Sequence, residues 1–446
     1  MNNYVRKLFG IIFQSQQTQQ IVHLQSQPSP TSPEEWHQHW QSQGQPWRTE
    51  PEINAERQAE LNRHRAIIPD IKKGIYPFKD MKLSRADVEW LLATHENGRG
   101  PVDWSDEGQR EREGLDLRGA DLRGVNLSRL PLACMVGGLD VAYNRAIHTY
   151  HGKEAAVMLD GANLRQAHLE GALLYDAKIR GAGLSDAFLQ EVQARWARME
   201  GSRMGRVHLE GANLRTAHLE GTTLAGAYLN GTNLQYAFFD AASSLSTLGP
   251  REAPAQVFGV RWGGVDLTHI DWSQVITLGD EENVKQQANR DLRLVRLHEA
   301  VRAYRKLAME LREQGLDEVA ARFTYRAQGL ERKIRWVQRE FGRWLFSLFL
   351  ALLTGYGYHM WRIVVAYLLV VSLCAAAYFV IGIYHPPHLT LLQAFLESIT
   401  AFHGRVFYEF FTPDAPQIWV TAVEAIAGLI IESVFIAMLT QKFFGK

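Results

Sequence analysis

The chain has 446 residues, with 48 basic and 48 acidic side chains, so its formal net charge is zero. This balance argues against a nucleic-acid-binding protein, which usually carries a basic face. The two cysteines are Cys134 and Cys374, and the second lies inside an apolar run, which excludes the disulfide scaffold of a small secreted protein.

The N-terminal 50 residues differ in composition from the rest of the chain. Residues 1–50 are rich in Gln, Ser and Pro, and we expect them to form a disordered tail. Trp36, Trp40 and Trp47 are exceptions, and we expect them to dock on the folded body or on a partner. The apolar stretch near the start is too brief for a signal sequence, so the bulk of the chain is expected to stay in the cytoplasm.

Residues 51–114 are predicted to form a helical cap. Ser84 precedes the run RADVEWLLATH, where an N-cap residue is expected. We expect this helix to cover the open end of the domain that follows.

Residues 115–279 repeat every five residues, in a pattern that begins GLDLR GADLR GVNLS. One position of each repeat is apolar and mostly large: Leu159, Leu164, Leu169, Leu174, Ile179, Leu184, Leu189, Ala194, Met199, Met204, Leu209, Leu214, Leu219, Leu224, Leu229, Leu234 and Phe239. The residue two positions earlier is small or β-branched: Ala162, Ala167, Ala172, Ala177, Ala182, Ala187, Val192, Ala197, Ser202, Val207, Ala212, Ala217, Thr222, Ala227, Thr232 and Ala237. Neither a helix nor a strand has this period, whereas a coil that turns a corner every five residues does. Residues 133–156 and 240–259 break the register and predict insertions, and Trp262, Leu267 and Trp272 resume it.

The runs LDGANLRQAHLEGALL and HLEGANLRTAHLEGTTLAGAYLNGTNL resemble the pentapeptide-repeat family. The resemblance implies a right-handed, four-sided β-helix whose coils are stable only when they stack on neighbours. His208 and His218 occupy equivalent repeat positions ten residues apart, so we interpret them as part of a surface ladder and not as a metal site.

Residues 280–342 show a helical pattern that predicts two helices joined at Gln314 and Gly315, with the glycine just after the first helix. The segment resembles one tetratricopeptide-like helical hairpin. We interpret it as a structural connector between the repeats and the segment that follows.

The C-terminal segment, residues 343–446, contains two apolar runs long enough to cross a bilayer. They are Ile363–Ile383 and Ile418–Thr440, and a crossing helix needs about 20 residues. Basic residues gather before the first run and follow the second, so the positive-inside rule places both ends in the cytoplasm. A helix over Trp344–Leu353 is expected to lie along the membrane surface. The TGYG sequence at 354–357 precedes the first span, so we interpret it as a turn.

The connector between the two apolar runs is too long and too apolar for a simple loop. Leu389–Phe402 has helical character but is too short to span, and a turn bearing Gly404 follows. A short helix in this place predicts a re-entrant pore loop, because irregular backbone at membrane depth is tolerated only beside protein or a water-filled cavity. Residues 343–446 resemble the two-span, pore-loop ion channels of the potassium-channel superfamily.

This resemblance implies positions for a pore helix, a filter and an inner helix. Glu397 lies near the end of the implied pore helix, and Gly428 lies at a hinge of the implied inner helix. The filter positions are Thr400, Phe402, His403, Gly404 and Arg405. The family's filter reads Thr-Val-Gly-Tyr-Gly, whereas this chain has one glycine there, so we expect selectivity unlike that of the usual potassium filter.

His403 and Arg405 leave two alternatives open. Around a fourfold axis they would form rings of donors and positive charge, which favour anions or a weakly selective pore. Alternatively, Arg405 turns away from the pore and pairs with Glu397 or Glu409.

Glu424, Gly428 and Glu432 are spaced to share one face of the second apolar helix. Ionisable groups inside a membrane default to functional positions, so Glu432 is the candidate for lining or gating the pore. Glu424 is assigned either a pore role or the holding of the pore helix. Ile436 is expected either to form an apolar constriction or to pack against the first span.

These segments predict a mixed fold: a right-handed quadrilateral pentapeptide-repeat β-helix, a helical linker and an α-helical two-span membrane domain with a re-entrant pore helix. The first functional hypothesis is a homotetrameric ion channel of the plasma (inner) membrane, multi-pass, with both termini cytoplasmic. Its β-helix would sense a protein or ligand. Membrane lipid and permeating ions are its other expected partners, and nucleic acid is not expected.

Two other classes of function are weighed against the channel. A membrane-anchored interaction scaffold would use the spans only as a tether. A topoisomerase inhibitor, known within the pentapeptide-repeat family, would want an acidic outer face, whereas these repeats carry Arg165, His168, Arg180, Arg215 and His218. The sequence contains no hydrolase triad, nucleotide-binding loop or metal-spaced His and Cys set, so we expect no enzyme, metal or cofactor.

Overall fold

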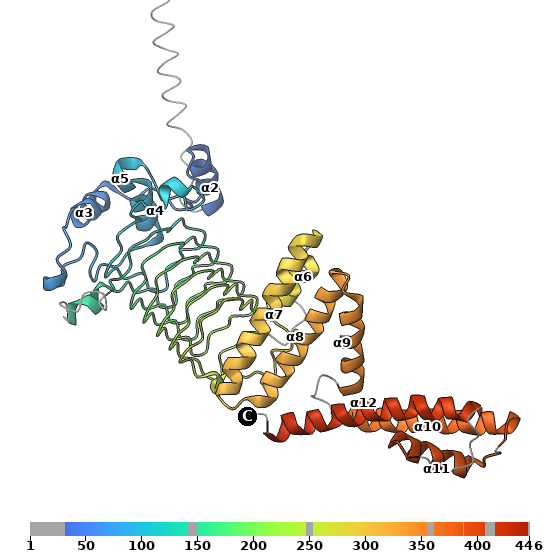
Figure 1. The fold of residues 1–446 in the computed structure, drawn as a ribbon. Helices are drawn as coiled ribbons and strands as arrows, with labels where there is room; N and C mark the ends of the chain where they lie inside the picture. The colour runs from blue at the N-terminus through green and yellow to red at the C-terminus, as the bar shows by residue number, and fades with distance from the viewer. Residues whose placement is uncertain are drawn as a thin grey trace, which may run out of the picture. The chain divides into compact units, whose positions relative to one another are not determined.

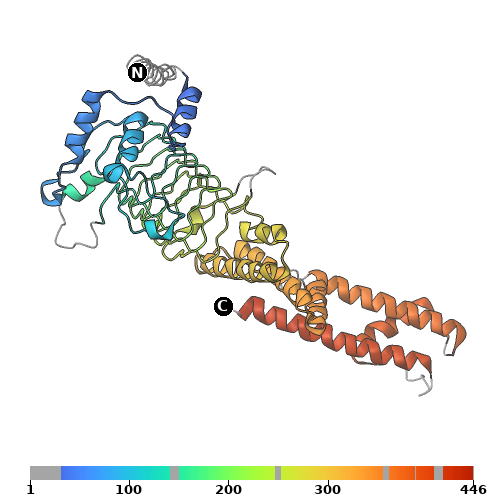
Figure 2. The same cartoon turned by 90° about the horizontal axis from the view of Figure 1, so that it is seen from above.

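The computed structural model describes residues 32–140, 150–246, 253–354, 361–386, 388–405 and 415–444. The chain divides into two units, Met1–Leu316 and Asp317–Lys446, each described by itself (Figure 1, Figure 2). Three predictions fall outside the described residues: the tail up to residue 31, the TGYG turn beyond Thr354, and the pairing of Arg405 with Glu409.

The first unit begins with short helical segments at the N-terminal end of the repeats (Figure 1). They are α2 (Pro33–Ser42), α3 (Ala55–Arg65), η1 (Ile71–Lys73), α4 (Arg85–Ala93), α5 (His95–Gly98) and η2 (Glu107–Gln109). Ser84 caps α4 as predicted, and its side chain accepts a hydrogen bond from Asp87 N while the Asp87 carboxylate accepts one from Ser84 N.

Tryptophans order part of the segment that the composition predicts to be disordered. In α2, Trp36 is buried, and its ring stacks on that of Trp40 with 6.1 Å between centroids. The Arg48 guanidinium lies 3.6 Å from the centroid of the Trp40 ring and pairs with Glu52 at 2.9 Å. Residues 32–50 therefore differ from the prediction, because aromatic and cation–π packing offsets the low aliphatic content.

The repeats form a coil whose successive turns are joined by parallel backbone bridges (Figure 1). Phe188 bridges to His208 and Gln193 bridges to Asn213, so one turn takes 20 residues, or four repeats. The bridges are isolated from one another, and no continuous strand occurs in the described part of the chain. The sequence predicts a β-helix. The structure has a stack of coil turns, and each repeat contributes one bridging residue before the chain turns a corner.

The five-residue period correctly predicts which residues fill the coil. The apolar residues from Leu159 to Phe239 are at most 6% exposed, and the small residues from Ala162 to Ala237 are at most 3% exposed. Polar members of the small set are satisfied by backbone carbonyls, since Thr232 Oγ1 donates to Leu209 O at 2.7 Å. The core is therefore continuous through the repeats.

Two insertions interrupt the coil where the period is lost. Asn126 bridges to Asn163, 37 residues later, and Tyr228 bridges to Gln256, 28 residues later. The first insertion contains η3 (Tyr150–Ala155). These offsets confirm the register breaks predicted from the sequence.

The C-terminal end of the coil is covered by η4 (Leu267–His269), α6 (Gly279–Gln286) and α7 (Arg290–Glu313). Gln314, the C-cap of α7, accepts a hydrogen bond from Leu267 N and donates one to Val265 O, both at 2.7 Å. Gly315 follows with a φ of +78°, as predicted. The first connector helix thus caps the coil.

A buried carboxylate also fastens this cap. Asp280 accepts hydrogen bonds from Val257 N at 2.8 Å and from Phe258 N at 3.0 Å. Burial raises the pKa of Asp280 to about 6, although these two amides favour its charged form.

In its described residues, the second unit consists of helices α8 (Asp317–Val337), α9 (Phe341–Thr354), α10 (Trp361–Tyr384), α11 (Leu391–Phe402) and α12 (Pro416–Phe444). α10 and α12 are antiparallel neighbours, because Tyr378 Oη donates to Thr421 Oγ1 at 3.0 Å while Ile363 clusters with Met438. α9 runs across their direction, the orientation expected of a helix along a membrane surface (Figure 1).

Candidate functional site

α10 and α12 are long and apolar enough to cross a membrane, as judged by length and composition. The stretches are Trp361–Tyr384 and Pro416–Thr440, which match the predicted spans closely. Many of their large apolar side chains are exposed: Val364, Leu368, Leu373, Val380, Val423, Ile426 and Leu429. A water-soluble monomer rarely exposes so much apolar surface, so these helices need lipid or another protein around them.

Between them lies α11, the short helix that the connector predicts. Thr390 caps it, accepting a hydrogen bond from Gln393 N while Gln393 Oε1 accepts one from Thr390 N at 2.9 Å. A helix of 12 residues is about 18 Å long, roughly three-fifths of the thickness of the hydrocarbon core, so it is too short to cross.

α11 enters beside the end of α10 and stops at the middle of α12. Near its start, Ala394 packs with Tyr378. Further along, Ser398 Oγ donates to Val371 O at 2.9 Å. Its last residue, Phe402, is buried against Gly428, which lies midway along Pro416–Thr440. α11 therefore accompanies its neighbours for half of their length, as a re-entrant helix would.

Gly428 allows this close approach of α11 to α12. A Cβ atom on Gly428 would lie 1.9 Å from Phe402 O, far inside van der Waals contact. The sequence assigns Gly428 to a hinge. In the structure it provides the space into which the end of α11 packs, and α12 continues helical past it.

The turn after α11 is polar and exposed. Gly404 has a φ of +71°, and Arg405 N donates to Thr400 O at 2.9 Å. His403 Nδ1 lies 2.5 Å from Glu432 Oε1, and both side chains are nearly half exposed. The structure thus brings together two residues that the sequence assigns to separate elements of a pore.

A second polar cluster lies between the helices, with Glu424 and Tyr378 fully buried and Cys374 partly exposed. The Glu424 carboxylate contacts the Ser398 hydroxyl and also interacts with the Tyr378 hydroxyl and the Cys374 thiol. Glu397 and Ser398, adjacent on α11, are both fully buried. Of the two predicted roles, this geometry gives Glu424 the holding of α11.

The structure separates the other predicted site residues. Thr400 bonds within α11, with its hydroxyl donating to Glu397 O at 2.9 Å. Phe402, Gly428 and the pair His403–Glu432 meet at mid-helix, while Arg405 and Ile436 are exposed. Sequence reasoning missed Ser398, Tyr378 and Cys374, although each is a polar or polarisable side chain in a run that is otherwise apolar.

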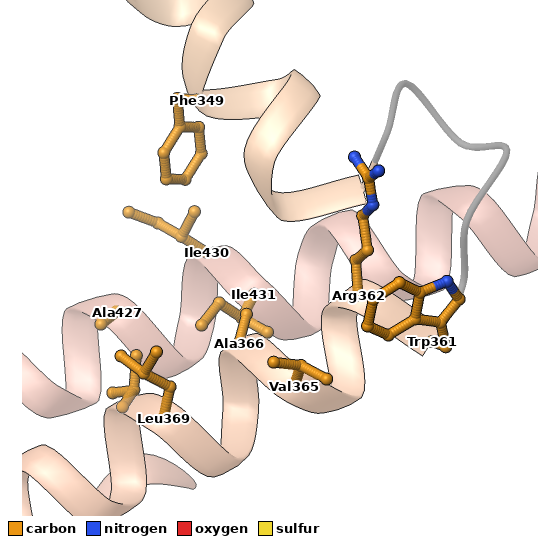
Figure 3. A pocket seen from close by; sticks show the side chains of 10 residues that line it. Phe349, Trp361, Arg362, Val365, Ala366, Leu369, Ala427, Ile430 and Ile431 are labelled. Carbon is orange, nitrogen blue, oxygen red and sulfur yellow. The ribbon is translucent and has the colours of Figure 1, made fainter.

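An apolar groove lies on the same helices. It has a volume of about 650 Å³ and is bounded by α9, α10 and α12 (Figure 3). Phe349, Leu369 and Ile430 form part of its wall, with Arg362 and Trp361 at one end. Arg362 Nη1 donates to Ala351 O at 3.1 Å, which ties the start of α10 to α9.

The family match lies within the repeats. A family model for pentapeptide repeats matches eight copies, over residues 159–193 and 208–243, so the chain contains a pentapeptide-repeat domain. No curated protein sequence matches the chain.

In the described residues, no group of His, Cys, Asp and Glu could hold a metal ion.

Several solved structures are similar to parts of the chain. The pentapeptide repeat protein Rfr23 from the cyanobacterium Cyanothece 51142 is 26% identical, with 28% of this chain and 90% of that chain covered and a TM-score of 0.20. HetL from Nostoc sp. strain PCC 7120 is 16% identical, with 42% and 94% covered and a TM-score of 0.15. QnrB1, a plasmid-mediated fluoroquinolone resistance protein, is 19% identical, with 35% and 81% covered and a TM-score of 0.16.

Proposed function

We propose that the chain is a subunit of an oligomeric ion channel with a cytoplasmic pentapeptide-repeat domain that regulates it. In this proposal α10 and α12 cross the plasma membrane, both termini are cytoplasmic, and α11 with the turn 403–405 forms the pore loop. The observation that carries the proposal is that α11 stops against Gly428, halfway along two apolar helices, and continues into a polar turn.

A polar turn at this depth needs water or protein around it. An irregular segment cannot face lipid, because its backbone groups would lose their hydrogen bonds. His403 and Glu432 remain nearly half exposed in the single chain, and ionisable groups at mid-membrane are costly unless they line a cavity. Further subunits that enclose this face would supply that cavity. A tether alone would need none of these features.

The finer features of the proposal come from the two resemblances. Fourfold symmetry follows from the likeness to the potassium-channel superfamily, and a right-handed, four-sided β-helix follows from the pentapeptide family. The C-terminal end of α11 carries a partial negative charge, which His403 and Arg405 oppose. We therefore propose weak selectivity, or a preference for anions, in place of potassium selectivity.

Reversal potentials test the proposal. Purified protein in planar bilayers under a KCl gradient should give discrete currents, and Arg405→Glu should move the reversal potential toward that of cations. The matched control is Arg215→Glu, the same charge change on an exposed arginine of the coil, which should leave the reversal potential where it is. An unchanged reversal potential in Arg405→Glu would refute a pore-lining Arg405.

A membrane-anchored scaffold remains the second candidate. The coil favours it by presenting a surface ladder in which His168, Phe188, His208 and Tyr228 stack with centroids 4.3–5.0 Å apart. The sequence places His208 and His218 in one ladder, whereas the structure puts them in two, because a turn takes 20 residues: His208 stacks on Phe188 and Tyr228, and His218 stacks on Phe238. The longer of these ladders would offer a partner a continuous surface. If no current appears at any voltage although the same sample contains intact oligomers, the scaffold becomes the better-supported function.

A further inference from the structure

The N-terminal end of the coil contains a polar cavity that neither proposed function uses. It has a volume of about 620 Å³, within the range of small-molecule sites, and lies between the arm that follows α2 and the first coil turns. The lining residues that matter for its chemistry are Trp47, Asn126, Arg129, Asn163, Arg165 and Gln166.

Two arginines give the cavity its charge. Arg129 and Arg165 lie on adjacent turns, joined by the hydrogen bond from Arg129 N to Arg165 O at 3.0 Å. Among the described residues neither guanidinium has an ion-pair partner, and Arg129 Nε donates to the neutral Gln166 Oε1 at 2.9 Å. Glu50 is the one carboxylate among the described residues that line the cavity. The planar fork of an arginine pairs well with phosphate oxygens, so two arginines in one cavity favour a phosphate group as the ligand.

Trp47 adds an aromatic side chain to the lining, and its segment is held in place. Trp47 belongs to the arm whose next residues, Thr49 and Glu50, donate their backbone N–H groups to the fully buried Glu89 at 2.9–3.0 Å. Arg85, which also pairs with Glu89 at 2.7 Å, donates to the coil through Asn126 O at 3.0 Å. The arm is thereby fixed to the coil, so a ligand would meet a wall that is already ordered.

Amide side chains stand beside the arginines. Asn163 Nδ2 donates to Asn126 Oδ1 at 3.0 Å, so the two residues form a rung on the coil wall. The oxygens of Asn126, Asn163 and Gln166 accept hydrogen bonds within the protein, and these bonds fix the three amides in place. The amide N–H groups of Asn126 and Gln166 suit an acceptor on the edge of a heterocycle. An inorganic anion would accept hydrogen bonds from these amides but would make no use of Trp47.

We propose that this cavity binds an organic phosphate that carries an aromatic ring, a ligand of the nucleoside phosphate class. Its phosphate lies on Arg129 and Arg165, and its ring lies against Trp47 with its edge toward the amides. Because the ligand touches both the arm and the coil, its binding stabilises the cap on the first repeats. This inference stands whether or not the membrane helices conduct.

Binding of ATP to the full-length protein in detergent, measured by calorimetry with EDTA present, tests the proposal. ATP should bind, and Arg129→Gln and Arg165→Gln should each weaken it by about tenfold or more, since each removes hydrogen bonds to a charged group. Trp47→Leu should weaken ATP more than inorganic phosphate. The control is Arg203→Gln, another exposed arginine of the coil outside the cavity, which should bind ATP as the parent does.

Three results would overturn the proposal. ATP could fail to bind at millimolar concentration to folded protein, with the fold verified by circular dichroism. The double variant Arg129→Gln/Arg165→Gln could bind ATP as tightly as the parent. Inorganic phosphate could bind as tightly as ATP, which would leave the aromatic wall without a role.

Discussion

The coil and the helices α10–α12 both depend on small residues at close contacts, but they place them in opposite ways. In the coil, one small residue occurs in every repeat, and all members of the set from Ala162 to Ala237 are buried alike. In the helices, a single glycine, Gly428, admits Phe402 O. In the coil, many equivalent contacts together determine how the chain packs. In the helical group, a few contacts determine it.

This difference extends to polar groups. The coil buries hydroxyls such as that of Ser202, which donates to Ile179 O at 2.6 Å, and these bonds stay within the backbone ladder. The helical group buries the Glu424 carboxylate among side chains of α10 and α11. A repeated fold should therefore lose stability gradually under substitution, while the helical group should fail at single positions.

Gly428→Ala is the most direct test of this comparison, because it alters the single glycine on which the helical group depends. We expect α11 to undock, at a cost of about 3 kcal/mol or more, because the new Cβ would meet the Phe402 carbonyl, which belongs to backbone and cannot move alone. Cys374 interacts with Glu424 beneath α11 and reports the change. In a Cys134→Ser background, its labelling by a small thiol reagent should become much faster.

The control for that variant is Gly329→Ala on α8. A Cβ there has no neighbour within 4 Å, so labelling of Cys374 should stay at the parent rate. Equal labelling in both variants would show that the end of α11 does not need Gly428.

The two regions also differ in how far the sequence predicts them. Every large and small repeat position from Leu159 to Ala237 could be assigned, because one geometric rule recurs in each turn. The short helix α11 and the two apolar helices follow equally well from length and hydropathy. The five-residue rule makes no prediction for the ordered segment around Trp36. There, three aromatic residues order a segment whose composition is typical of disorder.

The contacts within the candidate site could be predicted only in part. The shared face of Glu424, Gly428 and Glu432 follows from helix geometry, and all three do point toward α11 or the turn after it. The partners His403 and Ser398 could not be deduced, because a contact between helices depends on their depth and rotation. Single contacts leave no periodic trace in a sequence.

Leu189→Ala tests the same comparison in the coil. Leu189 is fully buried, so the variant should lose about 4 kcal/mol through lost burial and the cavity that remains. The loss should appear as faster hydrogen exchange in the turns next to residue 189 and fade along the coil. Leu292→Ala on α7, where the leucine is 52% exposed, is the matched control and should change little. Uniform unfolding of all turns would contradict a stack with nearest-neighbour coupling.

The smallest expected effect concerns the buried carboxylate of the coil, the counterpart in this unit of Glu424. The pKa of Asp280 is raised from 3.8 to about 6, so the folded cap holds a proton that the unfolded chain releases between those values. Its contribution to stability is complete below about pH 4 and is lost as the pH rises through 6, a change of roughly 2 to 3 kcal/mol.

Hydrogen exchange of residues 253–286 from pH 4 to 7, corrected for the intrinsic rate, measures this change in stability. Asp280→Asn should flatten this profile, whereas Asp271→Asn should keep it, because the hydrogen bond from Ser273 holds the pKa of exposed Asp271 below its ordinary value. A profile that survives Asp280→Asn would place the titration at another group.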